Sequence, residues 1–294
     1  MSLEEARARA PGKLILAGEH AVVYGHPALA IAVDRGTRVT LRRRPGPTSL
    51  GRSAVRDPRL LPGLLTVLPV EGIEIDIDSD LPVGRGMGSS AALAVAVVRA
   101  HAALRGEPLD FETTHARAFG PERHFHGDPS GVDHAVSALG GGVRYRKGLD
   151  RPEIQPLRLP DLELVVVDSG APGDTAALVA GVRSRRPGID PALQRIGALV
   201  GELEAALGRA APLPELGGLL DENHTLLQRI GVSTPTLDAI VQTCRAAGAH
   251  GAKLAGAGGG GVVIALVDDA EPVLQAVRRA GWTAFRVGVA PRQG

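Results

Sequence analysis

The sequence has little cysteine and few aromatic residues, with Cys244 as its single cysteine. One cysteine excludes an internal disulfide and a metal site built on cysteine ligands, and it fits a reducing compartment. No apolar run reaches the roughly 18 residues of a membrane span, and the N-terminal segment lacks the apolar core of a signal peptide. We therefore expect a soluble, unprocessed, cytoplasmic protein that does not bind membranes.

An excess of charge of either sign is also absent. The 294 residues include 33 basic and 32 acidic side chains, so the overall balance does not favour nucleic acid as a partner. Lysine is scarce and occurs only at Lys13, Lys147 and Lys253. A Walker A loop needs a lysine after its glycines, and this chain has none between positions 13 and 147. The length favours two medium-sized domains.

A glycine-rich stretch before an alanine-rich segment is the most informative feature that is present. Residues 80–92 read DLPVGRGMGSSAA. Isoleucines alternate with acidic residues over 73–78, which predicts a half-buried strand, and 91–104 has the composition of a helix. The first N–H groups of a helix lack partners and carry partial positive charge, so this order predicts an anion site. The alternative is an ordinary helix entry with a serine as its N-cap.

A polar pair lies between two apolar runs near the N-terminus. Residues 14–17 and 28–33 read as buried strands, and Glu19 and His20 stand in the turn that joins them. Together with Lys13, this pair would suit a small polar substrate. The alternative is that both residues are exposed in the turn.

Residues 120–142 form a second polar segment, GPERHFHGDPSGVDHAVSALGGG. It places carboxylate, imidazole and hydroxyl side chains close together, but their spacing matches no zinc signature. A hard Mg²⁺ ion would select the Asp or Glu oxygens. The alternative is a polar loop in which Asp128 or Ser130 caps a helix over 132–139.

The remaining segments define the expected architecture. We expect a long loop or lid over 44–70, a short helix over 110–118, and solvent-facing arginine runs at 42–44 and 183–186. A buried strand at 162–167 precedes a helix-rich region that extends to Ala247. The glycine run at 256–261 indicates close approach of the backbone to a ligand, and we interpret it as a second phosphate-contacting loop, although it could be a tight turn. The final elements are a strand over 262–267, a helix over 270–280 and a strand over 282–287.

Four stretches together resemble the GHMP kinase superfamily over nearly the whole chain. They are PGKLILAGEHAVVYGHPALA, LPVGRGMGSSAA, HGDPSGVDHAVSALGG and KLAGAGGGG, and they occur in this order. Within the superfamily they are most similar to the mevalonate kinases. The resemblance implies an α/β (α+β) fold with an N-terminal domain like ribosomal protein S5 domain 2, residues 1–160, and a C-terminal ferredoxin-like domain, residues 161–294.

The resemblance also implies an activity. The chain would transfer the γ-phosphoryl group of ATP, with Mg²⁺, to the 5-hydroxyl of mevalonate, with the active site between the two domains. Alternatives are another small alcohol or phosphomevalonate as acceptor, or a non-catalytic kinase-like sensor of ligands. A homodimer is compatible with the resemblance.

Site residues follow from the matched motifs. Asp133 would be the catalytic base, and Lys13 would lie beside it on the path of the phosphoryl group. The mevalonate pocket would be lined by Glu19, His20 and Ser130. The Mg²⁺ ligands would be Ser90 and Glu122, which lies eleven residues before Asp133. The nucleotide-binding residues would be Ser79, Gly84, Arg85, Gly86, Met87, Gly88, Ser89, Ser90, Gly258 and Gly259.

The sequence departs from the family pattern at three places. Ala255 stands where the last motif often has Thr or Ser, and Ala171 and Gly173 stand where basic residues are common. These departures place in doubt the corresponding phosphate contacts. Arg85 and Met87 occupy variable positions of the glycine turn, where we expect substitution to be tolerated.

Overall fold

A computed structural model describes residues 3–53, 55–127, 130–148 and 151–292. The N-terminal half is built on a mixed sheet with strand order β3-β4-β2-β5-β6, and β1 pairs with β2 beside this path. All pairings are antiparallel except the parallel pair β3 and β4. The elements are β1 (Glu5–Ala17), η1 (Ala21–Tyr24), β2 (Pro27–Pro47), β3 (Ser49–Ser53), α1 (Leu60–Leu64), β4 (Glu71–Ser79), α2 (Ser89–Arg105), α3 (Phe111–His126), α4 (Val132–Leu139), β5 (Gly142–Arg146) and β6 (Glu153–Leu157).

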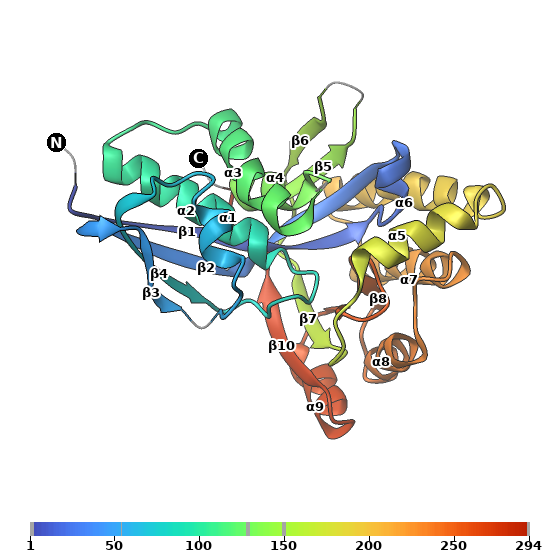
Figure 1. The fold of residues 1–294 in the computed structure, drawn as a ribbon. Coiled ribbons are helices and arrows are strands. Elements are labelled where there is room, and N and C mark those ends of the chain that lie inside the picture. The colour runs from blue at the N-terminus through green and yellow to red at the C-terminus, as the bar shows by residue number, and fades with distance from the viewer. Residues whose placement is uncertain (1–2, 54, 128–129, 149–150, 293–294) are drawn as a thin grey trace.

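One face of this sheet is covered by helices. Figure 1 shows α2, α3 and α4 grouped on the same side of the long strands β1 and β2. On β4, Ile73, Ile75 and Ile77 are buried, whereas the acidic residues between them are not. This alternation confirms the half-buried strand predicted from the sequence, and α2 confirms the predicted helix after the glycine turn.

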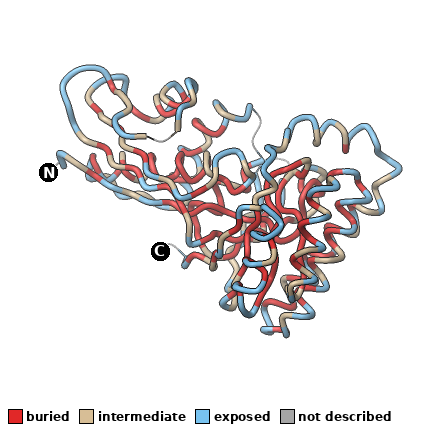
Figure 2. The backbone as a smooth tube through the Cα atoms, turned by 90° about the horizontal axis from the view of Figure 1, so that it is seen from below, coloured by how far each residue is buried: buried red, intermediate tan, exposed pale blue. Residues whose placement is uncertain are grey.

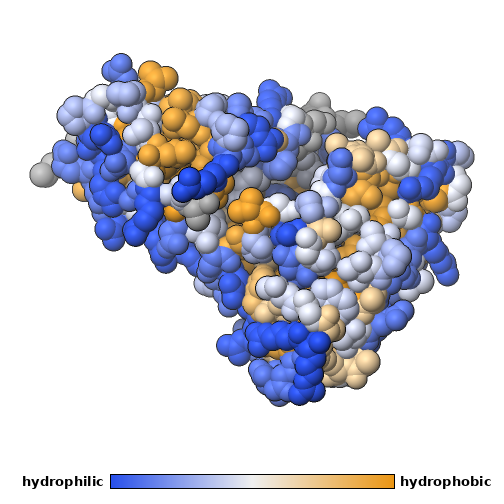
Figure 3. All heavy atoms as spheres, turned by 60° about the horizontal axis from the view of Figure 1, so that its bottom comes forward, coloured by the Kyte–Doolittle hydropathy of each residue, from blue (hydrophilic) through white to orange (hydrophobic). Residues whose placement is uncertain are grey.

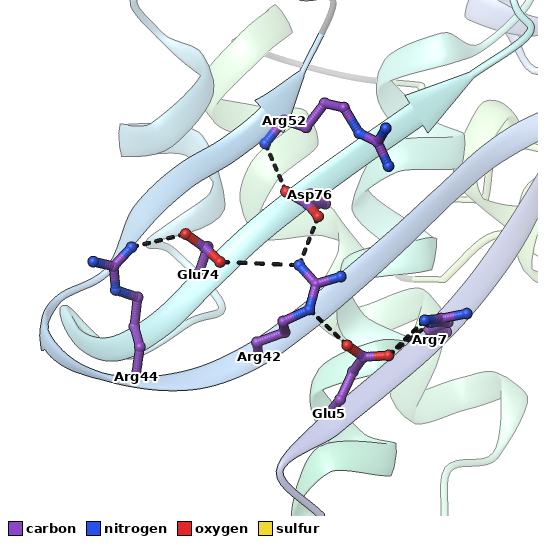
Figure 4. Close-up of polar contacts among 7 residues, drawn as sticks. All are labelled: Glu5, Arg7, Arg42, Arg44, Arg52, Glu74 and Asp76. Atoms are coloured by element: carbon purple, nitrogen blue, oxygen red, sulfur yellow. Dashed lines mark hydrogen bonds and ion pairs between the residues drawn. The ribbon is translucent and has the colours of Figure 1, made fainter.

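The opposite face of the sheet carries a row of ion pairs (Figure 4). Arg42 donates to Asp76 at 2.6 Å and to Glu5 at 2.6 Å, and Arg44 donates to Glu74 at 2.8 Å. Of the arginines predicted to form a solvated face, Arg42 and Arg44 lie on this face, whereas Arg43 is exposed but donates to the Leu3 and Leu104 carbonyls. Pairs of this kind between exposed groups contribute little to stability, about 0–1 kcal/mol each. Their main effect is to keep this face of the sheet in water.

The C-terminal half contains a four-stranded antiparallel sheet in the order β10-β7-β9-β8. The predicted strands, the helix-rich region and the final strand, helix and strand are confirmed. Figure 3 shows hydrophilic side chains over the end formed by α9, where Glu271, Arg278 and Arg279 are exposed. The elements are β7 (Glu163–Asp168), α5 (Thr175–Ser184), α6 (Asp190–Gly208), α7 (Leu213–Arg229), α8 (Pro235–Ala246), β8 (Gly251–Ala255), β9 (Val262–Val267), α9 (Ala270–Arg279) and β10 (Thr283–Gly288).

The two halves share part of their hydrophobic core. One cluster of buried residues combines Leu14 and Leu16 of β1 with Leu203 of α6 and Leu216 of α7. A backbone bridge between Val33 and Val289 joins β2 to the end of the chain. Figure 2 shows buried backbone continuing through the region where the halves meet. Their packing therefore supports elements on both sides of the site described below.

The prediction of a long loop or lid over residues 44–70 is wrong for most of its length. Strand β2 continues to Pro47, β3 pairs with β4, and α1 buries Leu60 and Leu64. The sequence is rich in Pro, Gly and Arg, so local propensity is weak here. Pairing with β4 and burial of leucines override it.

Helix α3 is longer than the predicted helix over 110–118. It continues through Gly120 and Pro121 to His126. Gly120 lies close to Thr66: a β-carbon built at this glycine would be 3.0 Å from the Thr66 hydroxyl. Packing against the segment after α1 therefore holds the helix across two residues that usually end one.

Within the described ranges, no helix has the length and apolar character needed to cross a bilayer.

Candidate active site

The glycine turn before α2 has an open helix start at its end. Gly84, Gly86 and Gly88 have φ values of +73°, +80° and +70°, which a residue with a side chain adopts only at a cost. Gly88 is the N-cap of α2, and among the described residues no side chain caps the helix. The alternative of a serine N-cap is therefore excluded. The first N–H groups of a 17-residue helix remain available to an anion.

Lys13 passes directly beneath this turn. Its backbone N–H donates to the Met87 carbonyl at 2.9 Å, and a β-carbon at Gly88 would lie 2.9 Å from Lys13 Cγ. Glycine at 88 thus allows the lysine stem to pack against the turn. The Lys13 side chain is 4% exposed, and its Nζ lies 3.1 Å from Asp133 Oδ1.

Asp133 lies in the first turn of α4, where the helix dipole favours a carboxylate. Its side chain is 34% exposed, so one side of the carboxylate pairs with Lys13 and another faces outward. Gly131, with φ of +90°, precedes the helix as its N-cap. Ser130 is therefore not the cap that we considered, and Asp128 lies outside the described residues. The Ser130 carbonyl accepts a 2.5 Å hydrogen bond from Tyr145, and its side chain is exposed beside the site.

Glu122 is a buried carboxylate on α3, close to the start of α2. Its side chain interacts with the Ser90 hydroxyl, while Oε1 has no hydrogen-bond partner among the described residues. Burial, followed by the charge of Asp133, raises the pKa of Glu122 to about 7. Ser90 Oγ also lies 2.9 Å from His126 Nε2. The structure therefore brings the predicted pair Ser90 and Glu122 together.

The chemistry of this pair fits a hard divalent cation. Magnesium prefers oxygen ligands and commonly takes only one or two from the protein, with the rest from phosphates and water. An orphaned, buried carboxylate oxygen beside a hydroxyl at the anion-binding end of a helix is such a donor set. In the part of the chain that the structure describes, no group of three His, Cys, Asp or Glu residues could hold a metal alone.

Glu19 lies in the turn that joins β1 and η1, and its side chain is buried. Its side chain is 1% exposed; Oε1 pairs with Lys253 Nζ, and Oε2 accepts from Asn223 Nδ2 at 3.0 Å. The alternative of an exposed turn residue is excluded. The geometry favours a role in holding the turn, because both carboxylate oxygens are already engaged by the protein.

His20 is also buried, and it has an unusual backbone conformation. Its φ is +60°, and its Nε2 lies 2.8 Å from the Ala257 carbonyl of the 256–261 loop. Burial lowers the pKa of His20. A strained residue at this position joins the N-terminal turn to the second glycine loop.

The 256–261 loop packs its backbone against three other segments. Gly259 N–H donates to the Val232 carbonyl at 2.8 Å, and a β-carbon at Gly260 would collide with the Ala171 and Pro172 carbonyls. A β-carbon at Gly261 would lie 3.1 Å from the Arg85 carbonyl. Close approach to the protein's own backbone therefore explains these glycines without a ligand. Contact of the loop with phosphate stays a prediction.

Two further residues of the glycine turn are held by contacts with the rest of the protein. Arg85 Nε lies 3.1 Å from Asp168 Oδ2 at the end of β7, and Arg85 Nη2 donates to the Gly170 carbonyl at 3.3 Å. Met87 is 1% exposed within the core. We expected both positions to tolerate substitution. That stays a prediction, and these contacts count against it.

Ser79 lies at the end of β4 rather than in the cluster around Lys13. Its hydroxyl is 2.9 Å from that of Thr37 on β2 and accepts from the Leu81 N–H at 3.4 Å. Its predicted contact with the nucleotide stays a prediction.

Two family models match separate stretches of the chain. The GHMP kinases N terminal domain matches residues 55–141, and the GHMP kinases C terminal domain matches residues 202–282. Mevalonate kinase of Pyrococcus horikoshii is 36% identical over 93% of this chain and 92% of its own length. The chain belongs to the GHMP kinase family. As a member of it, the protein is an ATP-dependent small-molecule kinase.

Further relatives support the same placement of this GHMP kinase. Mevalonate kinase of Thermococcus gammatolerans is 37% identical over 94% of this chain and 93% of its own length. The crystal structure of L. major mevalonate kinase in complex with R-mevalonate has a TM-score of 0.90 and 30% identity, and the match covers 99% of both chains. The GHMP kinase fold with its N- and C-terminal domains is thereby confirmed.

The sequence did not predict several side chains that contact the candidate site residues. No role was assigned to His126 in the polar segment 120–142. In the structure its Nε2 lies within hydrogen-bond distance of Ser90 Oγ. Asn223 lies in an ordinary helical pattern of α7, and no local signal distinguishes it. For Lys253 a signal existed, because a lysine in an apolar strand of a lysine-poor chain needs a partner.

Directly behind the kinase's Asp133, two histidines pack against each other. The rings of His134 and His115 have centroids 4.4 Å apart, and Phe119 meets His134 edge-on at 5.5 Å. Neither ring nitrogen of His134 has a hydrogen-bond partner among the described residues. Burial, followed by the neighbouring His115, lowers the pKa of His134 to about 4.

This lowered pKa predicts a loss of stability in acid. The unfolded chain takes up a proton near pH 6.5, whereas folded His134 resists protonation until about pH 4. The free energy of unfolding should therefore fall as pH drops from 6.5 to 4, by about 3 kcal/mol from this residue. In His134→Phe, urea unfolding measured at pH 7.5 and 4.5 should show a correspondingly smaller loss. The exposed His124→Phe is the matched control, and an equal acid loss in His134→Phe and wild type would contradict the assignment.

Proposed function

We propose that this kinase transfers the γ-phosphoryl group of ATP to the 5-hydroxyl of mevalonate. The observation that carries the proposal is the Lys13–Asp133 pair at 3.1 Å, placed under the open start of α2 beside buried Glu122. The identity of the acceptor is supported by full-length relatives that are mevalonate kinases, one of which has been solved with R-mevalonate bound.

Asp133 acts as the general base. An alcohol is a weak nucleophile at neutral pH, so a carboxylate must accept its proton as the bond to phosphorus forms. The partly exposed side of Asp133 is free to receive that proton. Lys13 holds the carboxylate in position and stabilises negative charge on the alcohol oxygen and the transferred group.

Ser90 and Glu122 are the residues that would hold Mg²⁺. When bound there, the cation would neutralise charge on the phosphates of ATP. The glycine turn at 84–88 and the N–H groups that open α2 bind the phosphates, and the 256–261 loop closes the opposite side. His20 and Ser130 lie on the acceptor side, and Glu19 fixes the turn beneath them.

A panel of acceptors tests this proposal. ADP release is measured in a coupled assay with mevalonate, phosphomevalonate, homoserine and galactose under the same conditions. We expect kcat/KM for mevalonate to exceed that for each other alcohol by at least about 100-fold, because acceptor polar groups without partners each cost 1–3 kcal/mol. A preference for another alcohol would reassign the acceptor. Binding of ATP with no ADP release from any of them would overturn the catalytic proposal and favour a sensor.

A further inference from the structure

A buried polar network joins three segments that are distant in the sequence. Lys253 of β8 has a fully buried side chain, and its ammonium group contacts the Glu19 carboxylate and the Ile15 carbonyl, the latter at 3.3 Å. Asn223 of α7 donates to Glu19 at 3.0 Å and to the Leu16 carbonyl at 3.4 Å. We call Glu19, Lys253 and Asn223 the strut. It ties the end of β1 and the turn after it to the C-terminal half.

The strut restricts how these segments can move relative to one another. Two opposite charges buried together cannot separate without leaving an uncompensated charge in the interior, which is strongly unfavourable. Asn223 adds directional hydrogen bonds to the same carboxylate and to β1. The turn at 18–20 therefore has one favoured position against β8.

Each end of the strut lies next to one side of the active site. Glu19 precedes His20, whose ring contacts the Ala257 carbonyl at 2.8 Å, and Lys253 lies on the strand that leads into the 256–261 loop. Gly256 in turn faces Gly86: a β-carbon at Gly256 would lie 3.9 Å from Gly86 Cα, and one at Gly86 would lie 3.6 Å from the Ala255 carbonyl. The acceptor-side turn, the second glycine loop and the glycine turn before α2 thus form a contiguous series of contacts.

We propose that Lys253 and Asn223 are positioning residues which, through Glu19, hold the 18–20 turn against the 256–261 loop and so couple acceptor binding to nucleotide binding. The coupling rests on the proposed function, because it takes the turn as acceptor side and the loop as nucleotide side. Because the strut connects the two segments, a ligand that restricts the motion of the turn also restricts the motion of the loop. The second ligand then binds with a smaller entropic cost.

Two strut variants test this proposal without relying on one that could fail to fold. Asn223→Ala removes the neutral member only. The double variant Glu19→Gln with Lys253→Met replaces both charges by neutral groups of similar size, which avoids an unpaired buried charge. Glu222→Gln is the matched control. Glu222 is the residue before Asn223 on α7, and its substitution removes an exposed ion pair with Arg195 of α6.

The first measurement is the affinity for ADP by calorimetry, with and without saturating mevalonate. We expect mevalonate to tighten ADP binding at least about fivefold in the wild type and in Glu222→Gln, within the usual range for coupled sites, and less than about twofold in both strut variants. A merely structural role would lower stability and leave this ratio unchanged. Coupling retained in both strut variants, or absent in the wild type, would overturn the proposal.

The second measurement is amide hydrogen exchange of the ligand-free protein. Exchange should accelerate together in the peptides that contain residues 18–20 and 256–261 in both strut variants, and remain as in wild type in Glu222→Gln. This result does not depend on the acceptor. Failure of mevalonate to bind would overturn the proposed function. Unchanged exchange in the two peptides of the strut variants would separately overturn the proposal that the strut holds the turn against the loop.

Discussion

Replacing Asp133 by asparagine is expected to lower kcat by about 10²- to 10⁴-fold, the usual contribution of a general base. The amide cannot accept the proton of the alcohol, so the chemical step loses its base. The KM for ATP should change little, because the glycine turn and the start of α2 are untouched. Initial rates of ADP release over a range of both substrates separate these two effects.

The fold should survive this substitution. Asparagine retains an oxygen that can accept from Lys13, which is 4% exposed and would otherwise be a buried charge without a partner. Asp174→Asn is the matched control: Asp174 is the N-cap of α5 and accepts from the Ala177 N–H, and asparagine caps a helix equally well. Its turnover should stay within about twofold of wild type. A near-normal kcat for Asp133→Asn, with the same thermal midpoint, would remove Asp133 from the catalytic role.

Features of the site that depend on neighbours in the sequence were predictable. The glycines at 84, 86 and 88 with the helix after them indicate an anion site, because positive φ and an uncapped helix start are local properties. The alternation over 73–77 indicates a strand for the same reason. The resemblance to the family came from four motifs in a fixed order, and no single stretch was specific enough to indicate it.

Features that depend on tertiary contacts were not predictable in this way. Residues 44–70 have weak local preferences, and their strand and helix form because β4 and α3 offer partners. Helix α3 likewise continues past Gly120 and Pro121, where it packs against Thr66. Composition indicates the conformation that a segment prefers in isolation. In these two segments, contacts with neighbouring elements determine the secondary structure instead.

Glu19 illustrates the same limit at the level of a single side chain. A carboxylate beside a histidine in a turn suggests substrate binding, and the partner that engages it, Lys253, lies 234 residues further along the chain. Pairing across such a separation leaves no local pattern. The two scarce lysines with buried positions, Lys13 and Lys253, are both engaged by carboxylates, so the chain's lysine usage reflects site construction in these two cases.

Glu122→Gln is expected to lower activity and raise stability at the same time. Loss of a carboxylate ligand should reduce kcat/KM at limiting Mg²⁺ by about 100-fold or more, since metal stabilisation of transition-state charge amounts to several kcal/mol. The folded-state pKa of Glu122, about 7, lies above its ordinary value of 4.5, because the interior disfavours the charged form. The stability associated with its neutral form is complete below pH 4.5 and is lost as pH rises through about 7.

The stability gain of Glu122→Gln should therefore depend on pH with a definite sign. Glutamine is neutral at every pH, so the gain in unfolding free energy should reach about 3 kcal/mol at pH 8.5 and vanish near pH 4. Urea unfolding across this range measures it, and titration of ADP release with Mg²⁺ measures the functional loss. Glu112→Gln, at an exposed position in the first turn of the same helix, should change neither. If Glu122→Gln showed the pH-dependent gain in stability but kept the wild-type dependence of ADP release on Mg²⁺, Glu122 would be a buried carboxylate without a metal role. Burial alone accounts for the stability gain, whereas a changed Mg²⁺ dependence requires that Glu122 bind the metal.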